Sequence, residues 1–106
     1  GNVSDRDALI VDDEILTGGT IVEAMELLRR HRARSIHIAC VHPLFTDTAL
    51  ERLDIPEISE IVFTDTVPVS PDAFRNVPTN MLSVAPLFGD AMHRIHTGGS
   101  VSELFR

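Results

Sequence analysis

The chain has 106 residues, of which 43% are hydrophobic and 24% are charged, a composition that favours one globular domain and excludes extended disorder. Sixteen acidic residues against nine basic ones give a formal net charge of −7, so we expect no nucleic-acid surface, because a polyphosphate backbone would be repelled. The longest apolar run, residues 8–11, is too short to span a membrane, and we expect a cytoplasmic protein without membrane contact.

The first elements in chain order surround the sequence VDDEILTGGT, residues 11–20. The apolar run at residues 8–11 predicts a short strand that ends at Asp12. From Ile21, apolar residues recur at helical spacing as far as two arginines, which predicts a helix over residues 21–30. The motif therefore contains a loop between a strand and a helix.

Further strands and helices alternate along the chain. Residues 35–41, SIHIACV, alternate polar and apolar side chains before a His-Pro pair, which predicts a second strand. Three prolines indicate a loop over residues 67–78. The other expected elements are a short helix at residues 46–53, a third strand at 60–63, a fourth strand at 81–84 and a helix at 86–96.

This alternation predicts the α/β class. Strands joined through helices pair in parallel by right-handed crossovers, so we expect a parallel sheet flanked by helices that cover both faces. No linker, repeat or low-complexity tract divides the sequence. In such sheets ligands bind at the carboxyl ends of the strands, and the VDDEILTGGT motif lies at one of these ends.

The second half of the motif is suited to a phosphate. Gly18 and Gly19 allow a sharp turn and a close approach of their N–H groups to a ligand, while Thr17 and Thr20 add hydroxyl donors. The following helix adds unpaired N–H groups and the positive end of its dipole. A second glycine pair, in HTGGS at residues 96–100, has no acids or strand before it, and there we expect a helix C-terminus with a left-handed glycine.

The first half of the motif adds two carboxylates, Asp12 and Asp13. Carboxylates bind hydroxyl groups or a metal ion, so the motif suggests one ligand with a phosphate at one end and vicinal hydroxyls at the other, such as ribose 5-phosphate. Mg²⁺ can bridge the like charges. An ordinary structural interpretation stays open, because a strand-end aspartate can cap a turn and a glycine pair can turn the chain without binding anything.

Other motifs fit less well. A Walker A loop needs a lysine, whereas all nine basic residues are arginine, and the dinucleotide fingerprint G-x-G-x-x-G is absent. The single Cys40 cannot form an internal disulfide, and no cysteine or histidine group has zinc spacing. The stretch ALIVDDE resembles a response-regulator receiver with Asp54 as its phosphorylated residue, although no apolar strand leads into Asp54. The receiver is kept as an alternative.

Several stretches resemble one enzyme family. ALIVDDEILTGGT resembles the 5-phosphoribosyl 1-diphosphate (PRPP) motif of type I phosphoribosyltransferases and, more closely, of the ribose-phosphate diphosphokinases, or PRPP synthetases. VFTDTVP resembles a strand end of the synthetases, and SVAPLFGDAMHRIHTGGSVSELF resembles their C-terminal tail. The resemblance implies a phosphoribosyltransferase-like fold, with residues 1–106 as a C-terminal domain or fragment and the ATP-binding half absent upstream.

The resemblance also implies an activity, the transfer of diphosphate from Mg-ATP to the anomeric hydroxyl of ribose 5-phosphate in nucleotide biosynthesis. Asp12 and Asp13 would contact the ribose hydroxyls, directly or through Mg²⁺, and the residues that would hold the 5-phosphate are Thr17, Gly18, Gly19 and Thr20. The family commonly assembles, so we expect a homo-oligomer. Without the ATP-binding half, we expect the chain alone to be inactive.

Some positions depart from the family or lie outside the motif. Leu16 stands where many members carry an acid, and Pro43 and Asp47 replace glycines of a family stretch that contributes to a regulatory phosphate site. His42 and Asp65, each at a strand end, are secondary candidates for the site. A solvent-facing histidine and a capping aspartate are the alternative interpretations.

Two other functions stay open. A fragment of a PRPP-using phosphoribosyltransferase would share the sugar-phosphate loop, and only its partner substrate would distinguish it. A noncatalytic module would bind sugar phosphate or assemble with a catalytic homologue, and the leucine at position 16 together with the absent half of the site favours it.

Overall fold

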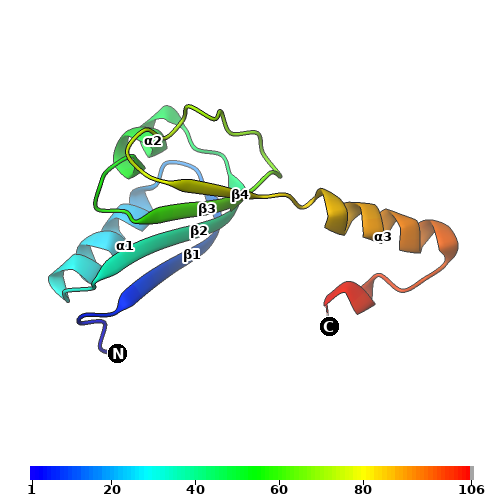
Figure 1. Cartoon of the computed structure of the whole chain (residues 1–106), viewed down its shortest axis with the longest axis horizontal. Helices are drawn as coiled ribbons and strands as arrows, with labels where there is room; N and C mark the ends of the chain where they lie inside the picture. The colour runs from blue at the N-terminus through cyan, green and yellow to red at the C-terminus, as the bar shows by residue number, and fades with distance from the viewer. Residues whose placement is uncertain (106) are drawn as a thin grey trace.

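A computed structural model describes residues 1–105 as a four-stranded parallel sheet with helices (Figure 1). The strands are adjacent in chain order, β1-β2-β3-β4. No helix within the described residues is both long and apolar enough to cross a membrane. The elements are β1 (Asp7–Ile15), α1 (Gly19–Arg30), β2 (Ser35–Pro43), α2 (Asp47–Leu53), β3 (Glu60–Thr64), β4 (Thr79–Leu82), α3 (Ala85–Thr97) and a 3-10 turn, η1 (Ser102–Phe105).

The hydrophobic core lies between the sheet and two helices on one of its faces. Ile21 of α1 and Leu53 of α2 are buried against Ile38 and Ile61, which project from the two middle strands. Successive residues of a strand point to opposite faces of the sheet, so Ile36, Ile38 and Cys40 of β2 enter this core. The expected α/β class with a parallel sheet is confirmed.

The opposite face of the sheet is uncovered, which corrects the expectation of helices on both faces. Leu9 and Val11 of β1 are 62% and 70% exposed, and Leu82 of β4 is 60% exposed. A shallow apolar hollow on this face is bordered by Val11, Ala39 and Val62. The face stays open because α3, the last helix, extends away from the sheet instead of folding back over it (Figure 1).

The boundaries of several elements also differ from the sequence expectation. β1 continues to Ile15 because its ladder with β2 extends as far as Pro43, and α1 begins at Gly19 rather than at residue 21. β4 occupies residues 79–82 instead of 81–84. The strand ends early because the Ser83 hydroxyl and the Val84 N–H, which lie just before α3, donate hydrogen bonds to the Asp65 side chain.

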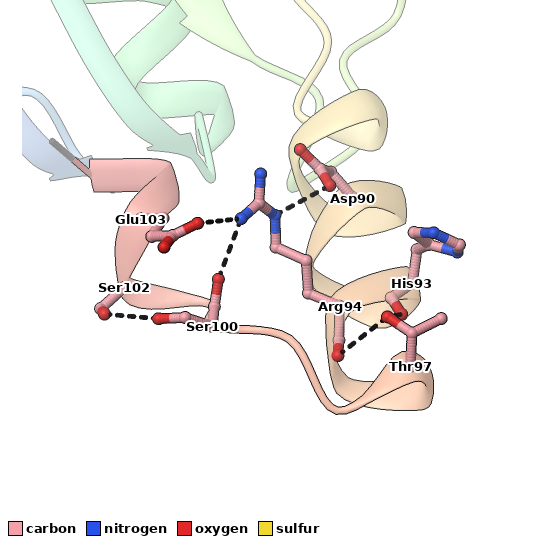
Figure 2. Close-up of polar contacts among 7 residues, drawn as sticks. All are labelled: Asp90, His93, Arg94, Thr97, Ser100, Ser102 and Glu103. Carbon is pink, nitrogen blue, oxygen red and sulfur yellow. Dashed lines mark hydrogen bonds and ion pairs between the residues drawn. The ribbon is translucent and has the colours of Figure 1, made fainter.

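The C-terminal segment forms an arm. Residues on one stripe of α3, Phe88, Met92 and Ile95, are exposed, and none of the helix is buried. Figure 2 shows how Arg94 joins the helix to η1: its guanidinium donates to Asp90 at 3.1 Å, to the Ser100 carbonyl at 3.1 Å and to Glu103 at 3.0 Å. The left-handed glycine expected in HTGGS is confirmed, since the residue at position 98 ends the helix with a φ of 77°.

Candidate functional site

The VDDEILTGGT motif begins inside β1, beside the carboxyl end of β2. Glu14 pairs with His42, and Ile15 pairs with Pro43. Asp13 and Glu14 are both exposed whereas Ile15 is buried, so the regular alternation of strand faces is interrupted here. The interruption places Ile15 in the core and leaves neighbouring carboxylates at the edge of the sheet.

A polar hollow of about 340 Å³ lies at this edge and is lined by residues 12–21. Its walls include carboxylates from the end of β1 and hydroxyl and backbone groups from the loop and the first turn of α1. The structure therefore brings together all six residues predicted to bind substrate, namely Asp12, Asp13, Thr17, Gly18, Gly19 and Thr20.

The glycine pair shapes the loop. Gly18 has a φ of 78° and is the N-cap residue of α1. A Cβ atom there would lie 3.4 Å from Leu53 Cγ and 3.7 Å from Ala49 Cα, so glycine permits both the left-handed turn and the close approach of α2. The backbone N–H groups of Gly19 and Thr20 have no acceptor within residues 1–105, as expected in a first helical turn. They and the helix dipole are available to an anion.

The carbonyl groups of the loop are held on the α2 side. Thr46 donates to the Leu16 carbonyl from its backbone N–H at 3.0 Å and from its hydroxyl at 2.9 Å. Arg52 Nη1 donates to the Thr17 carbonyl at 3.1 Å. In a trans peptide the N–H group points opposite to the preceding carbonyl, so the N–H groups of Thr17 and Gly18 point away from α2.

Sequence reasoning missed three residues of this arrangement. Glu14 lines the hollow beside the two predicted aspartates, and the run of three acids in the motif was a visible signal for it. Thr46 and Arg52 hold the loop from 30 and 35 residues away. No local pattern indicates such contacts, because they depend on how α2 packs.

The carboxylates at the hollow are suited to a Mg²⁺ ion whose remaining ligands come from water and substrate. Within residues 1–105, no group of three or more histidine, cysteine, aspartate or glutamate side chains is arranged to hold a metal ion. Mg²⁺ is commonly held by one or two carboxylates together with water and substrate phosphate oxygens. Asp12 and Asp13 supply such carboxylates at the wall of the hollow. The residues are therefore compatible with an ion that binds together with substrate.

The two secondary candidates lie outside the hollow. His42 is exposed, and its Nδ1 lies 2.9 Å from the Thr66 hydroxyl. Asp65 accepts hydrogen bonds from the Ser83 hydroxyl at 2.7 Å and the Val84 N–H at 2.8 Å, and these bonds lower the pKa of its carboxyl group. Both of its oxygens are thus engaged at the junction between β4 and α3.

Two further side chains, of Asp54 and Cys40, have structural roles. Asp54 follows α2 and accepts the backbone N–H groups of Arg75 and Asn76. A receiver's phosphorylated aspartate ends a strand, so the receiver alternative is wrong. Cys40 is buried, and burial, followed by the charge of Asp12, raises the pKa of its thiol to about 11. It is a core residue, as expected.

Similarity to known proteins extends over the whole chain. The family model described as "Phosphoribosyl synthetase-associated domain" matches residues 1–106. Proteins named ribose-phosphate pyrophosphokinase from Caldanaerobacter subterraneus and Oceanobacillus iheyensis are 44% and 41% identical over 105 residues, and in each case the match covers 99% of this chain and 33% of the relative.

A solved structure gives the same result. The crystal structure of phosphoribosylpyrophosphate synthetase from Mycobacterium smegmatis superposes with a TM-score of 0.84 at 34% identity, over 93% of this chain and 33% of that one. The chain thus spans about a third of the length of the relatives that it matches. Together with the full-length family match, these similarities show that the chain belongs to the phosphoribosyl synthetase-associated domain family.

Proposed function

We propose that this chain is the part of a ribose-phosphate diphosphokinase that binds ribose 5-phosphate and its product PRPP. One observation carries the proposal: a single hollow of about 340 Å³ is lined both by carboxylates and by backbone N–H donors that have no acceptor within residues 1–105. That layout complements a molecule with vicinal hydroxyls and a terminal phosphate. The names of the relatives, ribose-phosphate pyrophosphokinases, support the same substrate.

The roles of the residues follow from their chemistry. The N–H groups of Gly18, Gly19 and Thr20 and the two threonine hydroxyls of the loop would bind the 5-phosphate at the positive end of α1. Asp12 and Asp13 would accept hydrogen bonds from the ribose hydroxyls or hold Mg²⁺, which neutralises phosphate charge when bound. Holding the sugar at both ends would orient its anomeric hydroxyl for diphosphate transfer, where positioning supplies much of the catalysis.

We propose further that this chain is the C-terminal portion of a longer protein whose upstream part binds ATP. The chain spans a third of its relatives, and the open sheet face exposes Leu9 and Val11. The apolar stripe of α3, which includes Phe88 and Met92, is exposed as well. Sheets of α/β proteins are normally covered on both faces, so these surfaces fit contact with additional polypeptide, including another copy of the protein in a homo-oligomer.

Calorimetric titration of the chain with ribose 5-phosphate and Mg²⁺ tests the binding role. Asp12→Asn is expected to weaken binding about tenfold or more, the size expected for a lost charged hydrogen bond. Asp72→Asn is the matched control, because this exposed aspartate lies in the loop before β4, away from the hollow. Saturable binding that Asp12→Asn weakens and Asp72→Asn preserves supports the proposal; a folded chain that binds neither ribose 5-phosphate nor PRPP contradicts it.

A noncatalytic sugar-phosphate module is the second candidate, and Leu16 is the observation that favours it. Its side chain is 50% exposed and lines the hollow at the position where many synthetases carry an acid. Restoring an acid with Leu16→Asp in the longer protein distinguishes the two functions. PRPP formation by the unmodified longer protein supports the synthetase. The module is supported if the unmodified longer protein binds ribose 5-phosphate without forming PRPP, and PRPP formation is gained only in Leu16→Asp.

A further inference from the structure

Among residues 1–105, one cationic side chain contacts the loop that would hold the phosphate, and it comes from outside the motif. None of the residues that line the hollow is basic, and three of them, Asp12, Asp13 and Glu14, carry carboxylates. Arg52, in the last turn of α2, donates from Nη1 to the Thr17 carbonyl at 3.1 Å. The same nitrogen lies 3.2 Å from the point where a Cβ at position 19 would stand. Its positive charge therefore lies against the glycine pair.

The contact has a geometrical consequence for the donors of the loop. The peptide unit between Thr17 and Gly18 is planar and trans, so a carbonyl drawn toward Arg52 turns the Gly18 N–H to the opposite side. The preceding carbonyl, of Leu16, is drawn to the same side by Thr46. Two consecutive peptide units are thus fixed in one orientation before any ligand arrives.

The contact also has an electrostatic consequence. A phosphate that enters a hollow with three carboxylates is repelled, and a cation a few ångströms from the loop offsets part of that repulsion. Arg52 is well suited to both tasks, because a guanidinium keeps its charge at all ordinary pH values and its planar group donates in a defined direction. A lysine would supply the charge with less directional control.

We propose that Arg52 is a positioning residue of the phosphate loop: it fixes the Thr17–Gly18 peptide with its N–H toward the ligand side and lowers the electrostatic cost of phosphate entry. This rests on the proposed function, since a phosphate is the ligand that the loop would hold. Residue 52 itself does not line the hollow. Its effect is exerted through the backbone of the loop and through its charge.

Calorimetry with two probes, ribose 5-phosphate with Mg²⁺ and inorganic phosphate alone, tests the effect on binding. Arg52→Gln is expected to weaken both about tenfold, and Arg52→Lys to restore most of the affinity because it keeps the charge. Arg29→Gln, an exposed arginine in the last turn of α1, is the matched control and should leave both affinities unchanged. Equal affinities in Arg52→Gln and the unmodified chain would overturn the proposal.

NMR relaxation of the loop amides gives a readout that does not depend on binding. In Arg52→Gln the order parameters of the Gly18 and Gly19 amides should fall, while those of Arg29→Gln stay at the unmodified level. If the unmodified chain binds neither probe, the proposed binding function is wrong. The order parameters of the loop amides then decide alone whether Arg52 positions the loop. Unchanged order parameters in Arg52→Gln would refute the positioning role.

Discussion

Gly18→Ala is the substitution whose effect the structure defines most closely. The residue has a φ of 78°, a conformation that disfavours every side chain with a Cβ atom. The added methyl would meet Leu53 Cγ at 3.4 Å and Ala49 Cα at 3.7 Å, which is close to ordinary contact. The cost therefore comes mainly from the backbone conformation and less from collision with α2.

The magnitude follows from two opposing terms. A left-handed conformation costs a residue with a Cβ about 1–2 kcal/mol. Alanine also restricts the unfolded chain, which returns about 0.4–1 kcal/mol. The net loss is about 1 kcal/mol, or roughly 5 °C in the melting temperature of a domain of this size. Gly18→Asn should cost less, because asparagine tolerates this conformation, and Gly18→Val should cost more, because its branched side chain enters the space of Leu53.

Thermal unfolding followed by circular dichroism measures the effect, and Gly98→Ala is its control. Gly98 has nearly the same φ, 77°, but among residues 1–105 no atom other than those of its chain neighbours lies within 4 Å of its added Cβ, and it belongs to the arm after α3. The backbone strain in Gly98→Ala should loosen the arm without lowering the midpoint temperature of the main unfolding transition. The reasoning is refuted if Gly18→Ala is as stable as the unmodified chain, or if Gly98→Ala lowers the main transition by the same amount.

Three further predictions concern other parts of the chain. Because the pKa of the Cys40 thiol is about 11, a disulfide reagent at pH 8 should label the folded chain roughly a hundredfold more slowly than the unfolded chain, and equal rates would contradict its burial. The hydrogen bond from Arg34 lowers the pKa of Asp7, so this carboxylate stabilises the fold near neutral pH and the stabilisation is lost as the pH falls below about 4. The urea midpoint of Asp7→Asn should consequently change less with acid than that of the unmodified chain. Arg94→Gln should speed amide exchange in residues 98–105 while the main unfolding transition stays unchanged, since it removes the contacts that join η1 to α3; unchanged exchange would show that these contacts do not order the tail.

Local patterns predicted the elements around the motif well. The apolar run before Asp12 and the helical spacing after Ile21 placed a strand and a helix on either side of the glycine pair, and the structure contains both. The composition of the loop also led to six residues that line one hollow. These inferences succeeded because periodicity and turn chemistry act over a few residues.

Inferences that depend on distant parts of the chain were less successful. Helices were expected on both faces of the sheet, whereas α3 extends away from it and leaves one face open (Figure 1). Arg52 carries no sequence signal for its contact with Thr17, 35 residues away. Such contacts arise only after strands pair and helices pack.

The sequence by itself therefore determined the α/β class, the glycine turn and the residue types that line the hollow, because hydrophobic period and backbone freedom are properties of short stretches. Only the tertiary structure decided which face of the sheet is covered and which groups hold the loop carbonyls. Those features depend on the packing of α2 against the glycine pair, where Gly18 lies against Leu53 and Gly19 against Arg52. Packing of this kind is set by the whole chain, since each contact requires the others to be in place.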